Sequence, residues 1–243
     1  MKVFVCSDVH GNIRALDAAM SIYRREYPCD FLFLGDAVGY GAHPDACLDV
    51  ILNLPRAGLV LGNHDAATLP ETGKPDMNSV AVEAIEWTGR RLDERYREAI
   101  RRRFRLTVER EDILAAHGSP FRPEEWTYLV SPLEAEQAFF AGGFRVGFVG
   151  HTHTPAAFAF GRGGIPFVEG EPVALEPGER YIFNPGSVGQ PRDRDPRAAC
   201  LVYDGDAGTV TLRRCEYDIE AEAKDIVAAG LPAILAERLF VGA

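Results

Sequence analysis

The feature that most constrains the fold is a series of short apolar runs, each ending in glycine with aspartate, asparagine or histidine. In the first part of the chain these runs cover residues 3–7, 31–34 and 59–61, and amphipathic segments at 12–25 and 44–54 separate them. Runs of this length predict buried strands, and the segments between them predict helices. Strands alternating with helices imply a parallel sheet with crossovers, in which ligands bind at the carboxyl ends of the strands.

The rest of the chain combines helical and β-rich segments. Residues 79–103 are amphipathic and rich in arginine, which predicts a helical insertion between two strands. Further strands are expected at 113–116, 144–149, 158–160, 166–168, 181–183, 200–203 and 209–215, and closing helices at 219–229 and 233–239. No repeat or linker divides the sequence. We therefore expect a single α/β domain spanning residues 1–243.

The composition excludes some classes of partner and indicates a cellular compartment. The 26 basic and 36 acidic residues give a net charge of -10, which argues against duplex nucleic acid as a partner. The five cysteines are odd in number and lack CxxC spacing, so a reduced, cytoplasmic protein is expected. No stretch approaches the length of a membrane span, and no membrane partner is expected. The sequence does not indicate an oligomeric state.

Most of the histidines lie where predicted strands end. Five of the six histidines, with Asp8, Asp36 and Asn63, stand at these ends, and the five are His10, His64, His117, His151 and His153. Imidazole, carboxylate and amide groups together suit Mn, Fe, Co, Ni or Zn. These potential ligands are too many for one ion and suit two ions that share a carboxylate. The i, i+2 spacing within each Asp8–His10 and His151–His153 pair puts both side chains on one side of an extended backbone.

These residues form blocks that resemble the calcineurin-like metallophosphoesterases. The blocks are Asp8-Val9-His10-Gly11, Gly35-Asp36, Gly62-Asn63-His64-Asp65, His117-Gly118 and Gly150-His151-Thr152-His153. They occur in order across most of the chain, and their combination is specific. The resemblance implies a sandwich of two mixed β-sheets flanked by helices, which agrees with the β-rich second half.

The resemblance also implies a role for each residue. Asp8, His10 and His153 are expected to bind one divalent metal ion. Asn63, His117 and His151 are expected to bind the other, with Asp36 as the bridging carboxylate. His64 resembles the family histidine that binds no metal and faces the leaving group. In such a site two cations lower the pKa of a bridging water, and the resulting hydroxide attacks phosphorus. Manganese is the first expectation, with iron, zinc, cobalt and nickel as alternatives.

Several nearby residues leave alternatives open. The protein Ser/Thr phosphatase branch carries Asp-Arg-Gly after the bridging aspartate, where this chain has Gly39-Tyr40-Gly41. The group that orients His64 is therefore unidentified, and Asp65 is expected either to support His64 or to cap a helix. His43 is interpreted as a turn or helix-entry residue. The loop at 184–189 is expected near the site, and Arg192 beyond it is the candidate substrate-binding cation. The arginines of residues 90–105 either form a solvated helix face or overhang the site.

The leading prediction is a dinuclear metal-dependent phosphoesterase that hydrolyses small phosphodiesters, phosphomonoesters or both. The alternatives are a protein serine/threonine phosphatase and a metal-binding scaffold without catalysis. The missing Asp-Arg-Gly argues against the first alternative. The intact His64 and the complete ligand set argue against the second.

Overall fold

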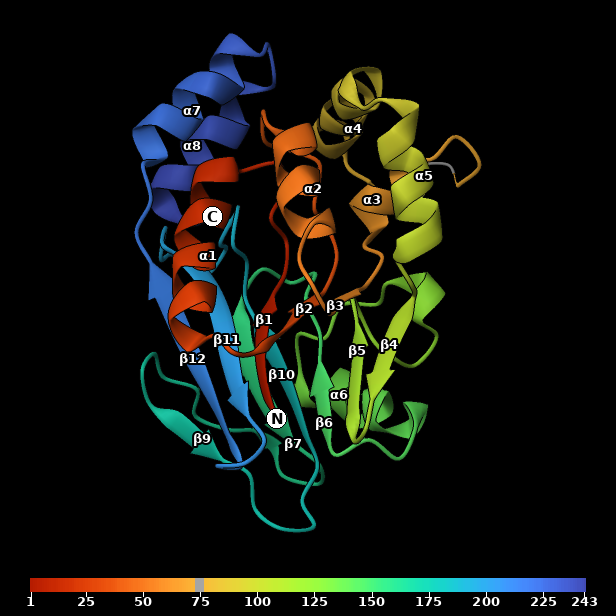
Figure 1. Cartoon of the computed structure of the whole chain (residues 1–243), viewed down its shortest axis with the longest axis vertical. Coiled ribbons are helices and arrows are strands. Elements are labelled where there is room, and N and C mark those ends of the chain that lie inside the picture. The colour runs from red at the N-terminus through yellow and green to blue at the C-terminus, as the bar shows by residue number, and fades with distance from the viewer. Residues whose placement is uncertain (73–76) are drawn as a thin grey trace.

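The computed structural model describes residues 1–72 and 77–243, which form two six-stranded sheets with helices around them (Figure 1). The first sheet has the order β3-β2-β1-β11-β12-β9. Strand β1 is parallel to β2, and β2 is parallel to β3, whereas β11 is antiparallel to β1. The strands of this sheet are β1 (Lys2–Cys6), β2 (Asp30–Phe33), β3 (Ala57–Leu59), β9 (Pro172–Ala174), β11 (Ala198–Asp204) and β12 (Thr209–Cys215).

The second sheet is also mixed, with the order β4-β5-β6-β10-β7-β8. Strands β5, β6 and β10 are parallel, while β4 and β7 are antiparallel to their neighbours. Its strands are β4 (Thr107–Arg110), β5 (Ile113–Ala116), β6 (Val146–Phe148), β7 (Pro155–Ala159), β8 (Gly163–Gly164) and β10 (Tyr181–Pro185). The expected sandwich of two mixed sheets is therefore confirmed.

Alternation along the strands divides the core into layers. In β1, Val3 and Val5 join the apolar cluster between the two sheets, whereas Phe4 and Cys6 face the helices. Successive side chains of a strand point to opposite faces, so a strand covered on both faces is apolar throughout. In β10, Phe183 likewise enters the inter-sheet cluster, and Ile182 packs on the opposite face.

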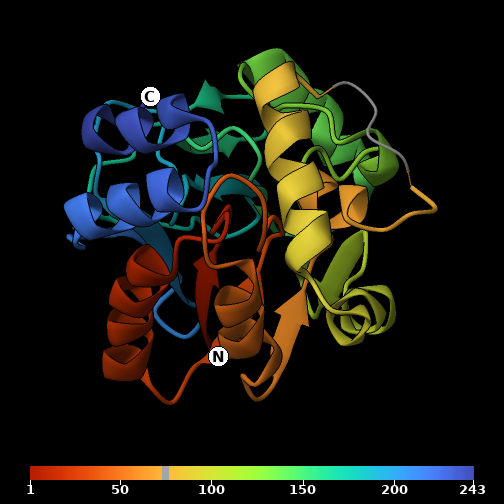
Figure 2. The same ribbon diagram turned by 90° about the horizontal axis from the view of Figure 1, so that it is seen from above.

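Helices cover both outer faces of the sandwich. Helices α1 (Ile13–Glu26), α2 (Pro44–Leu52) and α5 (Glu94–Arg103) contribute to the cluster on the first sheet, and α6 (Pro132–Ala138) packs on the second. Helix α4 (Ser79–Arg91) packs with α7 (Ile219–Ala228) and α8 (Ala233–Val241). Figure 2 shows this C-terminal helix pair beside α1, across the molecule from the green segment that contains α6.

The structure overturns one predicted strand and divides the predicted helical insertion into two helices. Residues 166–168 do not form a strand, and the strand in this region is β9. Ile165 and Phe167 pack partly buried against the inter-sheet core, which explains their strand-like pattern. The insertion at 79–103 is two helices, because Leu92 ends α4 and Asp93 precedes α5 in extended conformation. The short elements α3 (Asn63–Ala67), β4 and α6 were not expected.

All five cysteines lie within the described residues and none is in a disulfide. Three of them, including Cys6, are buried. Within residues 1–72 and 77–243, no helix combines the length and the apolar character that crossing a bilayer requires.

Candidate metal centre

The loops that follow five parallel strands bring the predicted ligands together. Asp8 and His10 follow β1, Asp36 follows β2, and Asn63 lies just beyond β3 at the start of α3. His117 follows β5, and His151 and His153 follow β6. Their side-chain atoms form clusters that could hold metal ions, one of Asp8, His10 and His153 and another of Asp36, His117 and His151. The two sheets of the sandwich thus supply different parts of one site.

The Asp36 carboxylate lies between the two clusters. Its Oδ2 atom is 3.3 Å from Nε2 of His117 and 3.7 Å from Nε2 of His10. Asp8 is closer to one side, with Oδ1 3.2 Å from Nε2 of His153 and 4.0 Å from Nε2 of His117. Asp36 therefore occupies the position of a carboxylate that two ions could share.

Backbone carbonyls orient three of the imidazoles. The Nδ1 atom of His10 lies 3.0 Å from the carbonyl oxygen of Val38, that of His117 lies 2.8 Å from Leu34, and that of His153 lies 2.6 Å from Gln190. A carbonyl only accepts, so each Nδ1 carries the proton and donates it. The Nε2 atom then points into the cluster, the arrangement that metal-binding histidines adopt.

Several acceptor atoms in the cluster face one another. The Nε2 atoms of His10 and His153 are 3.2 Å apart, and Nε2 of His117 is 3.2 Å from Oδ1 of Asn63. Oδ1 of Asp8 and Oδ2 of Asp36 are buried without a hydrogen-bond partner among the described residues. Buried lone pairs at these distances repel one another unless protons or metal cations lie between them. The donor set of nitrogen and oxygen atoms therefore fits divalent metal ions.

The backbone of the site is strained. Asp8, His10, Asp36, His151 and His153 have φ between 50° and 69°, in the left-handed region that non-glycine residues rarely adopt. Each such residue costs about 1–3 kcal/mol and persists only where surrounding contacts determine it. Five of the eleven non-glycine residues with positive φ in the described chain are predicted ligands, and strained backbone is common at functional sites.

Burial and neighbouring charges shift the pKa values of the cluster. Burial alone would lower the pKa of His117, but the Asp36 and Asp8 carboxylates outweigh it and raise the pKa to about 9. Burial dominates at His151 and His153, lowering their pKa values to about 3 and about 4. Burial opposes ionisation of Asp8, yet the surrounding imidazoles hold its pKa well below the usual range. The site thus keeps its carboxylates ionised, ready for cations.

His64 lies against the cluster and is held by packing. Its ring centroid is 4.8 Å from that of His10 and 4.6 Å from that of Tyr40. Its Nδ1 atom is buried without a hydrogen-bond partner in the described chain, and burial lowers its pKa well below the usual value. A Cβ on Gly39 would lie 2.4 Å from this nitrogen, so only glycine fits there. A ring nitrogen of His64 is also within 4.8 Å of ligand atoms of His10 and Asp36.

The Asp65 side chain holds the loop that carries Asp36, and none of its hydrogen bonds among the described residues goes to His64. Its carboxylate accepts hydrogen bonds from the amides of Asp36 at 2.8 Å and Ala37 at 2.9 Å, and a longer one from Gly62. The bond from Gly62 caps α3, so Asp65 fulfils the helix-capping alternative and also clamps the loop after β2.

Two tyrosines and Arg192 surround the cluster, and the tyrosines were not predicted. The Tyr128 ring stacks on His151 with centroids 3.8 Å apart, and the Tyr40 ring lies 4.5 Å from His10. The Arg192 guanidinium carbon is 5.9 Å from the Tyr40 ring centroid. Burial raises the pKa of both tyrosines, and the charge of Arg192 opposes the shift at both hydroxyls. The sequence signal for Tyr40 was its position in the replaced Asp-Arg-Gly segment.

The loop at 184–190 contacts the site through its backbone and side chains. Asn184 donates from Nδ2 to the carbonyl of Gly150 at 2.7 Å, and Ser187 donates to the carbonyl of Asp8 at 2.7 Å. The Arg192 amide donates to the carbonyl of His153, and its guanidinium donates to Oε1 of Gln190. This loop therefore positions both Arg192 and the turns that carry Asp8 and His153.

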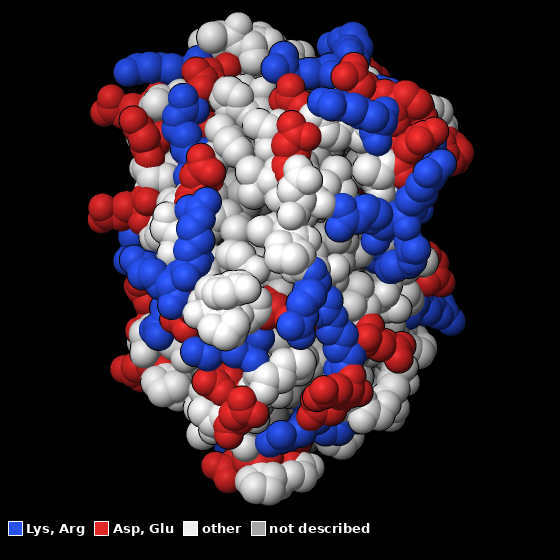
Figure 3. Space-filling view, in the orientation of Figure 1, with Lys and Arg blue, Asp and Glu red and all other residues white. Residues whose placement is uncertain are grey.

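The remaining candidates lie away from the cluster. His43 precedes α2, as expected, and its Nε2 is 2.8 Å from Oδ2 of Asp225. Arginines of the insertion have local partners; for example, Arg101 pairs with Glu71 and Glu94. Figure 3 shows basic and acidic side chains interspersed at the upper right of the view, where Figure 1 labels α4 and α5. These contacts favour the solvated helix face over the overhanging alternative.

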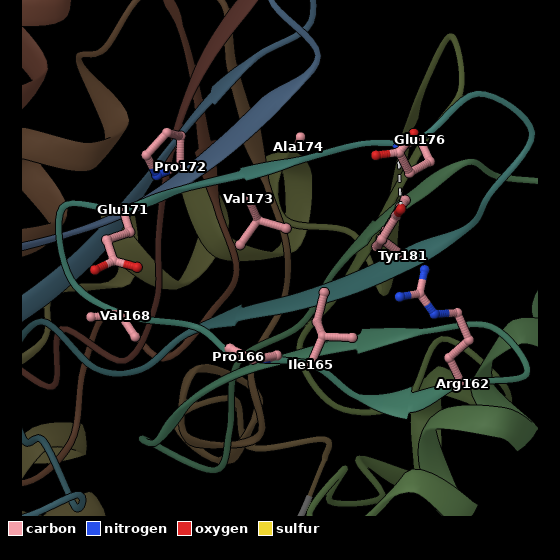
Figure 4. A pocket seen from close by; sticks show the side chains of 10 residues that line it. All are labelled: Arg162, Ile165, Pro166, Val168, Glu171, Pro172, Val173, Ala174, Glu176 and Tyr181. Carbon is pink, nitrogen blue, oxygen red and sulfur yellow. Dashed lines mark hydrogen bonds between the residues drawn. The ribbon is translucent and has the colours of Figure 1, made fainter.

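Two cavities differ in their relation to the cluster. A cavity of about 630 Å³ includes Asn63 and His151 in its wall and so opens onto the site. Another, of about 300 Å³, lies beside β8 and β9 (Figure 4), where Ile165 and Val173 point toward each other and Tyr181 accepts a hydrogen bond from the Glu176 amide. None of the predicted site residues lines this second cavity.

This two-sheet sandwich, with Asp and His side chains clustered beyond its parallel strands, is the arrangement expected from the resemblance to metallophosphoesterases. The family model of the calcineurin-like phosphoesterase superfamily domain matches residues 1–207, and the chain belongs to this superfamily. An uncharacterized protein of Methanocaldococcus jannaschii is 32% identical over 243 residues, covering 99% of this chain and 98% of its own length.

Two solved structures are similar over the whole chain. A metallophosphoesterase from Sphaerobacter thermophilus has a TM-score of 0.87 and 35% identity, covering 100% of this chain and 99% of that one. A hypothetical protein from Pyrococcus horikoshii has a TM-score of 0.81 and 20% identity, covering 100% and 98%, and supports the fold alone. The predicted family and fold are therefore confirmed, and a phosphoesterase hydrolase with candidate metal-binding residues is supported.

Proposed function

We propose that the chain is a dinuclear phosphoesterase that hydrolyses small phosphate esters. The observation that carries the proposal is the position of Asp36 between the His10 side and the His117 side of one buried cluster. Asp8, His10 and His153 would hold one ion, and Asn63, His117 and His151 the other, with Asp36 shared. Manganese is the proposed metal, because a mixed nitrogen and oxygen donor set suits it, with iron, zinc, cobalt and nickel as alternatives.

When bound, two divalent ions would lower the pKa of a water molecule and polarise the phosphoryl oxygens. His64 would then protonate or stabilise the oxygen that leaves. Arg192, anchored through Gln190 and His153, would contact a phosphoryl oxygen. The backbone bonds to Nδ1 would keep the histidine ligands fixed in orientation throughout.

Substrate class follows from the groups around the cluster. Tyr40 takes the place where protein serine/threonine phosphatases keep an arginine, so a dianionic monoester loses that cation. We propose that small phosphodiesters are cleaved at least as well as monoesters and that phosphopeptides are poor substrates. The net charge of -10 disfavours duplex nucleic acid.

The chain is further proposed to act as one domain over residues 1–243, because β1 from the N-terminus pairs with β11 from the C-terminal half. A cytoplasmic location is proposed from the five free cysteines.

The decisive experiment measures hydrolysis of bis-nitrophenyl phosphate by protein freed of metal and then reloaded with manganese. We expect turnover only after reloading, at two ions per chain. The Asp17→Ala variant, which changes an exposed aspartate of α1, serves as the matched control for an Asp36→Ala variant. Equal turnover with and without metal would contradict the metal-dependent mechanism, and stable binding of two ions without turnover would favour the scaffold alternative.

A further inference from the structure

One cavity opens directly beside the proposed metal centre. Asn63 and His151 form part of its wall, and residues 124–128, Val130 and Glu134 form the rest. Its volume of about 630 Å³ exceeds what a phosphate group needs. A phosphate held at the cluster would therefore direct one organic substituent into this space.

The loop that forms the cavity wall is fixed to the turn carrying His117. A Cβ on Gly118 would lie 2.7 Å from the carbonyl carbon of Trp126, so glycine is required for this close approach. The Ser119 amide donates to the carbonyl of Thr127 at 2.8 Å. The Trp126 indole lies near the carbonyl of Leu61, at 3.4 Å. These contacts hold the two aromatic rings of the loop in a defined position relative to the metal ligands.

The wall combines aromatic rings with negative charge. Trp126 and Tyr128 supply the rings, and the Tyr128 ring is half-exposed above His151. Glu124, Glu125 and Glu134 supply carboxylates, and among the described lining residues there is no lysine or arginine.

Two of the carboxylates have partners. Glu125 lies 3.3 Å from Arg122, and Glu134 accepts hydrogen bonds from Ser131. Glu124 has no hydrogen bond or ion pair within residues 1–72 and 77–243 and is exposed. Its charge is therefore the one most available to a ligand in this cavity.

We propose that this cavity is a subsite for a positively charged substituent of the phosphate ester, such as an alkylammonium group on a short chain. Aromatic faces attract such cations through their quadrupoles, and quaternary ammonium groups are bound in this way. Glu124 adds an attractive charge, whereas a substituent with a further phosphate or carboxylate would be repelled. This assignment rests on the proposed phosphoesterase function and names its substrate class.

The test compares two esters with the same leaving group. One is nitrophenyl phosphocholine, and the other carries a neutral tert-butyl group in place of trimethylammonium. Because shape and leaving group match, the ratio of their kcat/KM values reports the positive charge. We expect the manganese-loaded protein to prefer the cation by about fivefold to thirtyfold. Glu124→Gln should lower this ratio, while Glu220→Gln, the same change on α7 across the molecule, should leave it unchanged.

A second readout uses no turnover. In the metal-free Trp87→Phe variant, Trp126 is the remaining tryptophan, and tetramethylammonium should change its fluorescence in a saturable way. Adding Glu124→Gln should weaken this binding.

The proposal requires both results. A ratio below about threefold, a ratio that Glu124→Gln does not lower, or no saturable fluorescence change overturns the subsite. Metal-dependent turnover of the neutral ester at the same time would leave the phosphoesterase function standing. Absence of turnover of every ester would instead contradict the function itself.

Discussion

The carboxylate of Asp65 accepts a hydrogen bond of 2.8 Å from the amide of Asp36, so one buried aspartate fixes the loop that carries another. The same carboxylate binds the amides of Ala37 and Gly62. The loop after β2 and the start of α3 are thereby joined beside the predicted metal ligands.

Asp65→Ala should destabilise the protein and weaken metal binding. Removing the carboxylate leaves buried amides without acceptors, at about 1–3 kcal/mol for each. Loss of such a supporting contact should lower metal affinity by about 10-fold to 100-fold. Urea unfolding and metal titration measure the two effects. Asp65→Asn, which keeps one acceptor oxygen, should be intermediate, and full metal affinity in Asp65→Ala would disprove the clamp.

Asp36→Ala should lose metal from both positions and abolish activity, because the carboxylate faces both sides of the cluster. Metal analysis of the purified variant checks this. Asp8→Ala is the matched comparison, since Asp8 lies closer to His153 and is expected to serve one ion. Retention of two ions per chain in Asp36→Ala would exclude the bridging role.

His64→Ala should keep its metals and lose rate by about 10²–10⁴-fold, the range for a general acid. The loss should be smallest for esters with good leaving groups, which need no proton. Metal content and kcat on a leaving-group series provide the measurement. Because a His64 nitrogen lies near His10 and Asp36, loss of metal would reassign it as a ligand. An equal rate loss across the series would also reject the proton-donor role.

Small diesters should be hydrolysed at least as well as monoesters. The test compares kcat/KM for bis-nitrophenyl phosphate, nitrophenyl phosphate and a phosphoserine peptide under one metal condition. Arg192→Leu should reduce the monoester value more than the diester value, because the dianion depends more on a nearby cation. A preference for monoester or peptide above about tenfold, or about 1.4 kcal/mol, would contradict the diester assignment.

Two carboxylates of α7 should give opposite pH dependence of stability. Burial raises the pKa of Glu222, although Arg14 opposes the shift. Its contribution to folding stability is therefore fully present at pH values below its ordinary pKa of 4.5, and it is lost as the pH rises through the pKa in the folded protein. Arg14 and His43 lower the pKa of Asp225. Its contribution to folding stability is therefore present at pH values above its ordinary pKa of 3.8 and is lost as the pH falls through the lower pKa of the folded protein.

Urea unfolding at several pH values tests this pair. Relative to Glu222→Gln, the wild type should lose stability as pH rises from about 4.5. Relative to Asp225→Asn, it should lose stability as pH falls toward 3.8 and below. The same sign for both variants would show that Arg14 couples the two groups too strongly for separate contributions.

The sequence pattern predicted secondary structure correctly where one physical cause determined the residues, as in the buried strands. Buried strands such as β1 are apolar because both faces are covered, and the ligand-bearing loops follow them directly. Residues 166–168 were wrongly predicted as a strand. Ile165 and Phe167 pack partly buried against the core, which gives an irregular loop the composition of a strand. The break at Leu92 and Asp93 was missed because the amphipathic pattern continues across it into α5.

The sequence by itself determined the family, the sandwich and the set of residues proposed as ligands, because these depend on short motifs and on alternation along strands. Only the tertiary structure decided how the residues meet. It brought Tyr128 onto His151 and Tyr40 onto His64, and it assigned Asp65 to the Asp36 loop. These contacts join segments that are separated in the chain, because β2 pairs with β3 and β5 pairs with β6, and no local pattern encodes which strands pair.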